Sequence, residues 1–170
     1  MPTSFPAGLK RSAAMVVLQH QASFLLLRRN KAPHKDKYVP VGGKLEPYED
    51  PYTAARRELH EETGLQVDQL RYGGVLIETS PVNYNWQCNI YLTDIEDILP
   101  PYCHEGTLEW IDFDQLSEIP TPPTDWHIYQ FLVQGRPFAL NARYNADLQL
   151  LHMTEEISGE VLVDQSSLHQ

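Results

Sequence analysis

The sequence predicts a single domain of mixed α/β (α+β) type. The chain has 170 residues, which is enough for one domain with a buried core. Apolar runs of strand length recur along it, and two segments between them have the features of helices. Because 42% of the residues are hydrophobic and 21% are charged, the composition is that of an ordinary globular protein. We therefore expect a compact domain in which the strands pack together with two helices.

The clearest predicted element is a helix over residues 51–63. Asp50 stands at its N-cap, Pro51 takes the first helical position and Gly64 follows its last residue. These residue types are the ones that favour the beginning and the end of a helix. We expect the helix to begin at Pro51 and to end immediately before Gly64.

The other elements follow from apolar runs and from the turn residues between them. The turn-like pair His20-Gln21 separates the first two strands, and Gly42-Gly43 breaks the extended segment before it. In chain order we expect a loose leader at 1–11, strands at 13–18 and 23–27, a basic loop at 28–37, an extended segment at 38–41, strands at 70–79, 87–92 and 107–111, a second helix at 125–134 capped by Thr124 or Asp125, and a late strand at 138–140. The domain is expected to span 12–152, and the acidic, polar tail at 153–170 is expected to lack regular structure.

The net charge of −10 limits the classes of partner. Such a surface does not attract a nucleic-acid polymer or an anionic membrane. No apolar run approaches the roughly 18 residues of a membrane span, and the N-terminus lacks the layout of a signal peptide. Two cysteines without a secretion signal argue against a disulfide framework, so we expect a cytoplasmic protein. A phosphate-bearing substrate would then need local positive charge from basic loops or from bound cations.

Three glutamates share one face of the predicted helix. At about 100° per residue, Glu58, Glu61 and Glu62 fall within an arc of about 100°. Like charges at this spacing repel by a few tenths of a kcal/mol per pair. The helix dipole disfavours anions in the last turn by roughly 0.3–1 kcal/mol each. The arrangement is reasonable if a hard divalent cation, Mg²⁺ or in its place Mn²⁺, binds this face, because such ions prefer oxygen ligands and can bridge carboxylates to phosphates.

The segment from Gly43 to Leu65 resembles the Nudix box, G-x5-E-x7-R-E-U-x-E-E-x-G-U, where U is a bulky aliphatic residue. All nine fixed positions over the 23 residues match. The resemblance extends over about residues 12–140 and implies the Nudix α/β/α sandwich, with a mixed sheet between helices. It also implies a pyrophosphohydrolase, in which a metal-activated water attacks a nucleoside diphosphate linked to a further group.

The resemblance assigns roles to residues of the box. Glu58, Glu61 and Glu62 take the positions of the metal ligands and the catalytic base. Arg57 orients a glutamate, Glu49 assists, and Gly64 supports the box. Gly43 allows the close approach at the metal site.

Residues outside the box complete the implied site. Glu105 precedes the strand at 107–111, at the place of a loop glutamate that reaches the metals in MutT-type members, although a surface position would also explain it. Either Glu61 or Glu105 could remove the proton from water. Lys44, Arg29 and Lys37 could hold phosphates, whereas simple solubility would also explain the basic loop.

The substrate is less sharply indicated. The region after Glu105 resembles MutT-type enzymes that hydrolyse nucleoside triphosphates, including oxidised ones, to a nucleoside monophosphate and pyrophosphate. Their base-reading positions fall here on Val39, Pro122, Thr124 and Asp125, so one aspartate of a pair is kept. Asp125 could instead be only a helix N-cap. Nucleotide sugars such as ADP-ribose and a non-catalytic nucleotide sensor are the alternatives, and the protein could be a monomer or a homodimer.

Overall fold

The computed structural model describes residues 5–165, and these form ten strands, two α-helices and one 3-10 turn. In chain order the elements are β1 (Arg11–His20), β2 (Ser23–Arg29), β3 (Tyr38–Val39), β4 (Val41–Lys44), α1 (Pro51–Thr63), β5 (Arg71–Thr79), β6 (Trp86–Asp94), β7 (Gly106–Asp112), η1 (Phe113–Gln115), α2 (Pro123–Val133), β8 (Phe138–Tyr144), β9 (Leu150–Glu155) and β10 (Val161–Asp164). Neither helix is long and apolar enough to cross a lipid bilayer in this part of the chain.

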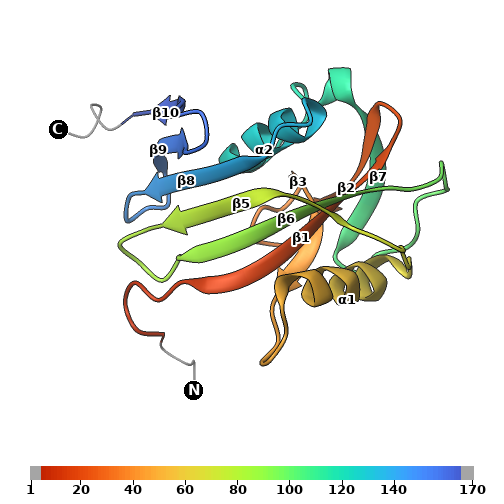
Figure 1. Cartoon of the computed structure of the whole chain (residues 1–170), viewed down its shortest axis with the longest axis horizontal. Coiled ribbons are helices and arrows are strands. Elements are labelled where there is room, and N and C mark those ends of the chain that lie inside the picture. Colours follow the sequence, from red (N-terminus) through yellow and green to blue (C-terminus); the bar gives the residue numbers. More distant parts are fainter. Residues whose placement is uncertain (1–4, 166–170) are drawn as a thin grey trace.

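One mixed sheet organises the molecule. Its strands follow the order β10-β9-β8-β5-β6-β1-β2-β3, with β4 also paired to β1 and β7 to β2. The pairs β1–β6 and β5–β8 are parallel, and the remaining pairs are antiparallel. Figure 1 shows the long strands side by side, with β7 and β2 together at one end of the molecule.

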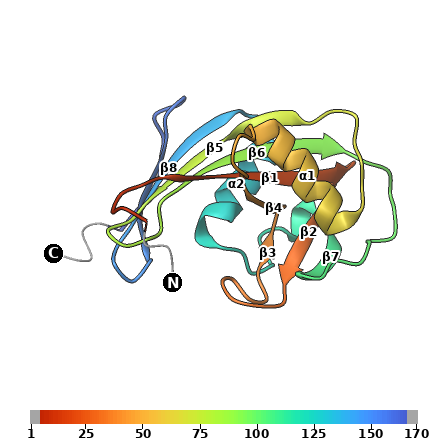
Figure 2. The ribbon, with the colours of Figure 1, turned by 90° about the horizontal axis from the view of Figure 1, so that it is seen from below.

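The two helices cover opposite faces of this sheet, as Figure 2 shows. Under α1, Ala54, Ala55 and Leu59 pack into a cluster with Val16, Leu18 and other buried residues of the sheet. Under α2, Ile128 and Tyr129 pack into a larger cluster with residues of β1, β5, β6 and β8. The predicted α/β/α sandwich is therefore confirmed.

The predicted ends of α1 are also confirmed. The Asp50 carboxylate accepts a hydrogen bond from the Thr53 amide at 2.8 Å, and Pro51 begins the helix. Gly64 has φ 75°, in the left-handed region that glycine adopts most easily, and its amide donates to the His60 carbonyl. The capping residues thus set where the helix begins and ends, and hence which turn of the helix carries the glutamates.

Three expectations were wrong. Gly42-Gly43 do not end the extended segment but lie within β4, because this segment pairs with β1 and Gly42 packs directly against the β1 backbone. Asp125 is not a helix cap, since α2 begins at Pro123 with Pro122 as its N-cap residue and no side-chain cap bond. The tail is not unstructured: residues from 153 complete β9 and also form β10, which extend the sheet, whereas residues 166–170 lie outside the described part of the chain.

Candidate active site

Arg57 is the centre of the candidate active site. Its guanidinium donates two hydrogen bonds to Glu49, both at 2.8 Å, and one to Glu58 at 3.0 Å. It also contacts Glu61 at 3.2 Å and donates to the Lys44 carbonyl at 3.2 Å. The paired bonds to Glu49 use the planar fork of the guanidinium, which a lysine lacks. The Arg57 guanidinium thus connects α1 to the loop that precedes it.

The pKa values of Glu49 and Glu58 differ, although both carboxylates are bonded to the Arg57 guanidinium. Hydrogen bonds from Arg57 lower the pKa of Glu49 to about 2. Burial raises the pKa of Glu58 in spite of Arg57, and the charges of Glu61 and Glu105 add to the increase. Glu49 is therefore a firm anchor, whereas Glu58 is a carboxylate whose negative charge is only partly balanced.

Gly43 brings the β4 backbone against Glu58. A Cβ atom at this position would lie 2.6 Å from Glu58 Oε1. The neighbouring Gly42 has φ 151°, and a side chain there would collide with the backbone of β1. Its amide donates to Glu62 Oε2 at 3.1 Å. The two glycines therefore allow β4 to contact the carboxylates of Glu58 and Glu62 on α1.

Glu62 and Glu105 lie together beside this cluster. Glu62 is 5% exposed, and burial followed by the nearby charge of Glu105 raises its pKa well above the usual range. Arg29 approaches Glu105 at 3.8 Å, and the Asn30 amide donates to the Glu105 carbonyl at 3.0 Å. The structure thus brings a residue from outside the helix to the predicted glutamates, although the two segments lie far apart in the sequence.

Glu61 differs from its neighbours. Its side chain is 54% exposed and contacts Arg57. As the side chains stand, no group of three or more His, Cys, Asp or Glu residues among residues 5–165 is arranged to hold a metal ion. Arg57 bonds one carboxylate oxygen of Glu58 and one of Glu61, which leaves the second oxygen of each for a cation. The donor set still has the chemistry of a site for a hard cation, since it consists of carboxylate oxygens close to a backbone without side chains.

The predicted phosphate-binding residues are less closely grouped. Arg29 lies at the site through Glu105, whereas the Lys44 ammonium lies 6.0 Å from the centre of the Trp86 ring. Burial and then the charge of Lys37 lower the pKa of His34, and Lys37 partly opposes the increase that burial causes in the pKa of Asp125. Asp125 and Gly64 are outside the glutamate cluster.

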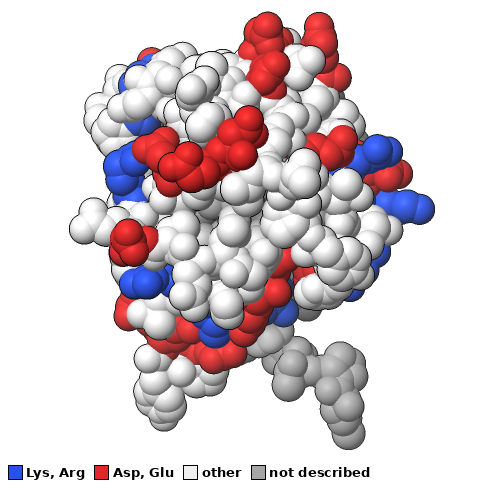
Figure 3. Space-filling model, turned by 90° about the vertical axis from the view of Figure 1, so that its right-hand side faces the viewer, with Lys and Arg blue, Asp and Glu red and all other residues white. Residues whose placement is uncertain are grey.

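The end of the molecule at which α1 ends and the β6–β7 connection runs is rich in acidic side chains. Figure 3 shows several groups of Asp and Glu on this face, with Lys and Arg mostly at its margins. An anionic substrate therefore approaches a surface of the same sign and needs counter-charge, as the net charge of the sequence suggested.

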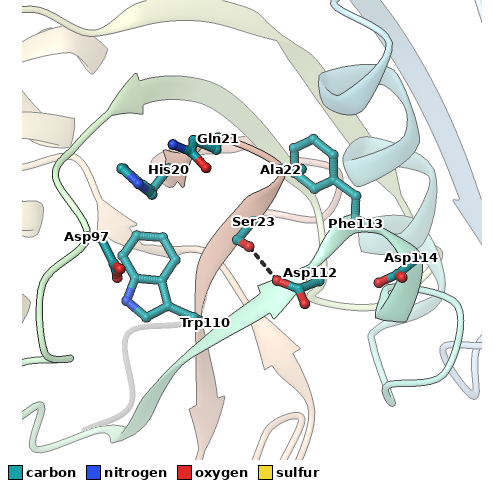
Figure 4. Close-up of a pocket in the computed structure, with 9 residues that line it drawn as sticks. All are labelled: His20, Gln21, Ala22, Ser23, Asp97, Trp110, Asp112, Phe113 and Asp114. Carbon is teal, nitrogen blue, oxygen red and sulfur yellow. Dashed lines mark hydrogen bonds between the residues drawn. The ribbon is translucent and has the colours of Figure 1, made fainter.

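A cavity of about 700 Å³ lies away from these residues. Figure 4 shows that it is formed by the β1–β2 turn, the end of β7 and η1, with Ser23 bonded to Asp112 and His20 near the Trp110 ring. None of the predicted site residues lines it. In the β2–β7 ladder, Ser23 pairs with Asp112 at this end, while Arg29 pairs with Gly106 at the active-site end. This cavity is thus not the candidate active site.

Two features were missed from the sequence. Gly42 holds Glu62 through its amide, and the Gly-Gly pair was the signal that could have indicated a close backbone contact. Glu78 is 5% exposed on β5 and lies near Asp125, but no local pattern distinguishes a buried glutamate from an exposed one in a strand.

Comparison with known proteins defines the family. A sequence model of the NUDIX domain matches residues 8–132, which is most of the chain. The chain belongs to the Nudix family. It is therefore a hydrolase that acts on pyrophosphate bonds of nucleoside diphosphate derivatives, and its box glutamates form the cluster described above.

Individual relatives agree with this assignment. The chain is 28% identical to the uncharacterized Nudix hydrolase YvcI of Bacillus subtilis over 127 residues, 71% of this chain and 77% of that protein. It is 27% identical to human diphosphoinositol polyphosphate phosphohydrolase 3-alpha over 94 residues, which is 55% of this chain and 56% of the human protein. The crystal structure of a MutT protein from Bacillus halodurans superposes with a TM-score of 0.76 at 22% identity, covering 86% of this chain and 98% of that one. That likeness supports the Nudix fold.

Proposed function

We propose that this Nudix hydrolase is a cytoplasmic, Mg²⁺-dependent enzyme that converts nucleoside triphosphates, including oxidised ones, to a nucleoside monophosphate and pyrophosphate. The observation that carries the proposal is the meeting of Glu58, Glu62 and Glu105 beside the bare backbone of Gly43. Both cysteines are free and buried, which agrees with a reducing compartment.

Carboxylate oxygens favour hard divalent cations, and Mg²⁺ is the one we propose. Glu58, Glu61 and Glu62 would hold it, with Gly43 next to them. Burial and mutual repulsion raise the pKa of Glu58 and Glu62, so a divalent cation would relieve an unfavourable accumulation of charge. When bound, such an ion lowers the pKa of a coordinated water and offsets charge on phosphate oxygens.

The protein side chains then have distinct tasks in the reaction. A water oxygen forms a bond to a phosphorus atom, the bond from that phosphorus to the bridging oxygen breaks, and a proton passes from the water to a carboxylate. We propose Glu105 as this base, because it contacts Glu62, whereas Glu61 is mostly exposed and turned to Arg57. Arg57 positions Glu58, and Glu49 in turn fixes Arg57.

Basic side chains near the site would bind the phosphates. Arg29 contacts Glu105, Lys44 follows Gly43, and Lys37 belongs to the loop between β2 and β3. Charge-assisted hydrogen bonds from such groups orient the phosphate chain and stabilise the charge that develops on it.

A non-catalytic nucleotide sensor is the rival from another class. Every fixed residue of the box is present, and Arg57, Glu49 and Glu58 form the contacts that an active site needs. A domain that only binds nucleotides has no need for this repulsive glutamate cluster, so the geometry favours the enzyme.

The test is a substrate panel with Mg²⁺: deoxynucleoside triphosphates, 8-oxo-dGTP, ADP-ribose, a dinucleoside polyphosphate and nucleotide sugars. Chromatography of the products separates monophosphate plus pyrophosphate from monophosphate plus sugar phosphate. We expect the former from triphosphates, with loss of turnover in EDTA. Turnover of ADP-ribose alone would replace the proposed substrate, and no turnover with any compound would favour the sensor.

A further inference from the structure

Two cationic side chains share the ring of Trp86 at the beginning of β6. The guanidinium carbon of Arg11 lies 4.1 Å from the centre of this ring, and the Lys44 ammonium lies 6.0 Å from the same centre. Arg11 pairs with Trp86, and Figure 1 shows the beginnings of β1 and β6 side by side. The Arg11 guanidinium also lies over the Phe5 ring, 4.6 Å from its centre. Aromatic rings attract cations, so two positive charges are held close to one ring.

The neighbouring Lys10 differs from Arg11 in its partners. Its ammonium donates hydrogen bonds to three oxygen atoms, which are the Glu78 carbonyl at 2.7 Å, the Thr79 hydroxyl at 2.5 Å and the Asn85 side chain at 3.3 Å. Among residues 5–165, neither the Arg11 guanidinium nor the Lys44 ammonium has a carboxylate within ion-pair distance or a hydrogen-bond acceptor. An aromatic ring attracts the charge but does not supply the oxygen acceptors that the five N–H groups of a guanidinium can use.

An anion is the ligand that these two cations fit. The molecule as a whole has a net charge of −10, yet this place presents two positive charges without a counter-charge from the described residues. A guanidinium binds phosphate oxygens in pairs, and an ammonium adds a point charge. Glu78 pairs with Trp86 across β5 and β6, but its carboxylate is bonded to Tyr144 on β8, which lies on the opposite side of β5 from β1.

The two cations and the glutamate cluster lie on opposite faces of the sheet. In β4, Lys44 pairs with Ala13 and Gly43 pairs with Ala14. Ala13 belongs to the hydrophobic cluster under α2, and Ala14 belongs to the cluster under α1. Because paired residues share a face, Lys44 is on the α2 face, whereas Gly43 meets Glu58 on the α1 face. Among the described strands β4 pairs with β1 alone, so a substrate can pass around its other edge from one face to the other.

The separation between the two places limits what could occupy both. The Cα atom of Lys44 follows that of Gly43 by about 3.8 Å. Arg11 lies one strand spacing of about 4.8 Å and two residues of about 3.4 Å each from Lys44. Arg11 is therefore on the order of 10 Å from the glutamate cluster. A diphosphate is shorter than this, so an anion at Arg11 would be a phosphate group beyond the diphosphate that is cut.

We propose that Arg11 and Lys44, over the Trp86 ring, form a subsite for a further phosphate group of the substrate, separate from the diphosphate that is hydrolysed. The inference rests on the proposed function, because it assumes a nucleotide at the glutamate cluster. The substrate class is then a nucleotide with an additional phosphate, either on its ribose or at the end of a longer phosphate chain. Arg11 does not contact the reacting phosphorus, so it acts on KM rather than on kcat.

The first experiment measures phosphate binding to the metal-free protein. Inorganic phosphate is titrated at an ionic strength held constant with chloride, and the indole ¹H–¹⁵N NMR signal of Trp86 is followed. We expect a saturable shift of this signal, with a dissociation constant about tenfold higher in Arg11→Gln, because a charge-assisted hydrogen bond is lost. Arg143→Gln, which removes an exposed arginine of β8, should match the wild type. No shift in the wild type, or an equal affinity in Arg11→Gln, would overturn the proposal.

The second experiment compares the hydrolysis of three nucleotides with Mg²⁺: ATP, ATP that carries a further phosphate on its ribose, and adenosine 5′-tetraphosphate. In the wild type, at least one of the two larger compounds should have a KM about tenfold below that of ATP. The compound that does so identifies where the additional phosphate is attached. In Arg11→Gln the KM values should become nearly equal with kcat little changed, whereas Arg143→Gln should retain the difference.

The two experiments separate the inference from the proposed function. If no triphosphate is hydrolysed but phosphate shifts the Trp86 signal with an affinity that depends on Arg11, the function fails and the anion subsite stands. If triphosphates are hydrolysed and the ratio of KM values is the same in the wild type and Arg11→Gln, the function stands and the inference fails.

Discussion

Two groups of carboxylates in this molecule use opposite physical environments. Around Arg57, a guanidinium lowers the pKa of Glu49 to about 2 and keeps it ionised. Around Glu78 the donors are neutral groups such as the Tyr144 hydroxyl and the Cys88 thiol, and burial followed by the charge of Glu78 raises the pKa of Asp125 to about 7. Within the first group Glu49 thus stays ionised, whereas burial raises the pKa of Glu58 and Glu62, as it raises that of Asp125. The ionisation of a carboxyl group thus depends on its neighbours.

The largest effect should come from the first group. Glu62→Gln and Glu58→Gln should each lower kcat/KM by about 10³-fold, because each removes a carboxylate that would bind the metal. Steady-state kinetics with Mg²⁺ measures this, and Glu118→Gln is the matched surface control. Because the pKa of Glu62 is raised in the folded state, Glu62→Gln should also increase stability at neutral pH. An inactive variant with lower stability would contradict that account.

Replacing Arg57 tests whether its guanidinium holds Glu49 and Glu58 in place. Arg57→Lys should lower kcat by about 10²-fold, because a lysine cannot make the two parallel bonds to Glu49 and still reach Glu58. The adjacent and exposed Arg56→Lys provides the control in the same kinetic assay. Equal activity of both variants would show that the fork geometry is not needed.

The ionisation of Asp125 in the second group should be visible in the free energy of unfolding. The pKa of Asp125 is raised from 3.8 to about 7, so its contribution to stability falls as pH rises from about 4 to about 7 and is constant above that. Asp125→Asn should therefore be more stable than the wild type by up to about 4 kcal/mol at pH 8 and nearly equal to it at pH 4. Urea unfolding at the two pH values measures the difference. A constant difference would mean that ionisation is not the cause.

The smallest expected effect is a change in stability at low pH when Glu49 is replaced. Since the pKa of Glu49 is lowered from 4.5 to about 2, its ion pair stabilises the fold above pH 4.5, and this contribution is lost as pH falls towards 2. The urea midpoints of Glu49→Gln and the wild type should differ at pH 6 and converge near pH 2. Midpoints that differ equally at both pH values would assign the effect to packing.

The comparison also shows where sequence analysis succeeds. The Arg57 group lies largely within one helix and the loop before it, so local rules for caps and helical periodicity were enough to place it. Asp50, Pro51 and Gly64 fixed the helix to the residue. Glu105 was expected from the family resemblance, and its contact with Glu62 follows from the fold.

The second group could not be predicted in this way. Glu78, Asp125 and Tyr144 come from β5, α2 and β8, and only the packing of α2 onto the sheet and the parallel β5–β8 pair bring these elements together. The error at Asp125 has the same origin: Pro122 and Pro123 begin α2 earlier than the side-chain pattern suggested. Strands β9 and β10 were missed because a polar segment becomes a strand when it can pair with a neighbouring edge.

The sequence by itself determined the family, the helix and the identity of the box glutamates, because these depend on spacing along the chain. The tertiary structure decided which carboxylates are buried, which donors they meet and hence which of them hold protons. Burial and long-range pairing are properties of the packed sheet and have no local signature. The identity of the carboxylates is therefore specified by the sequence, and their ionisation by the fold.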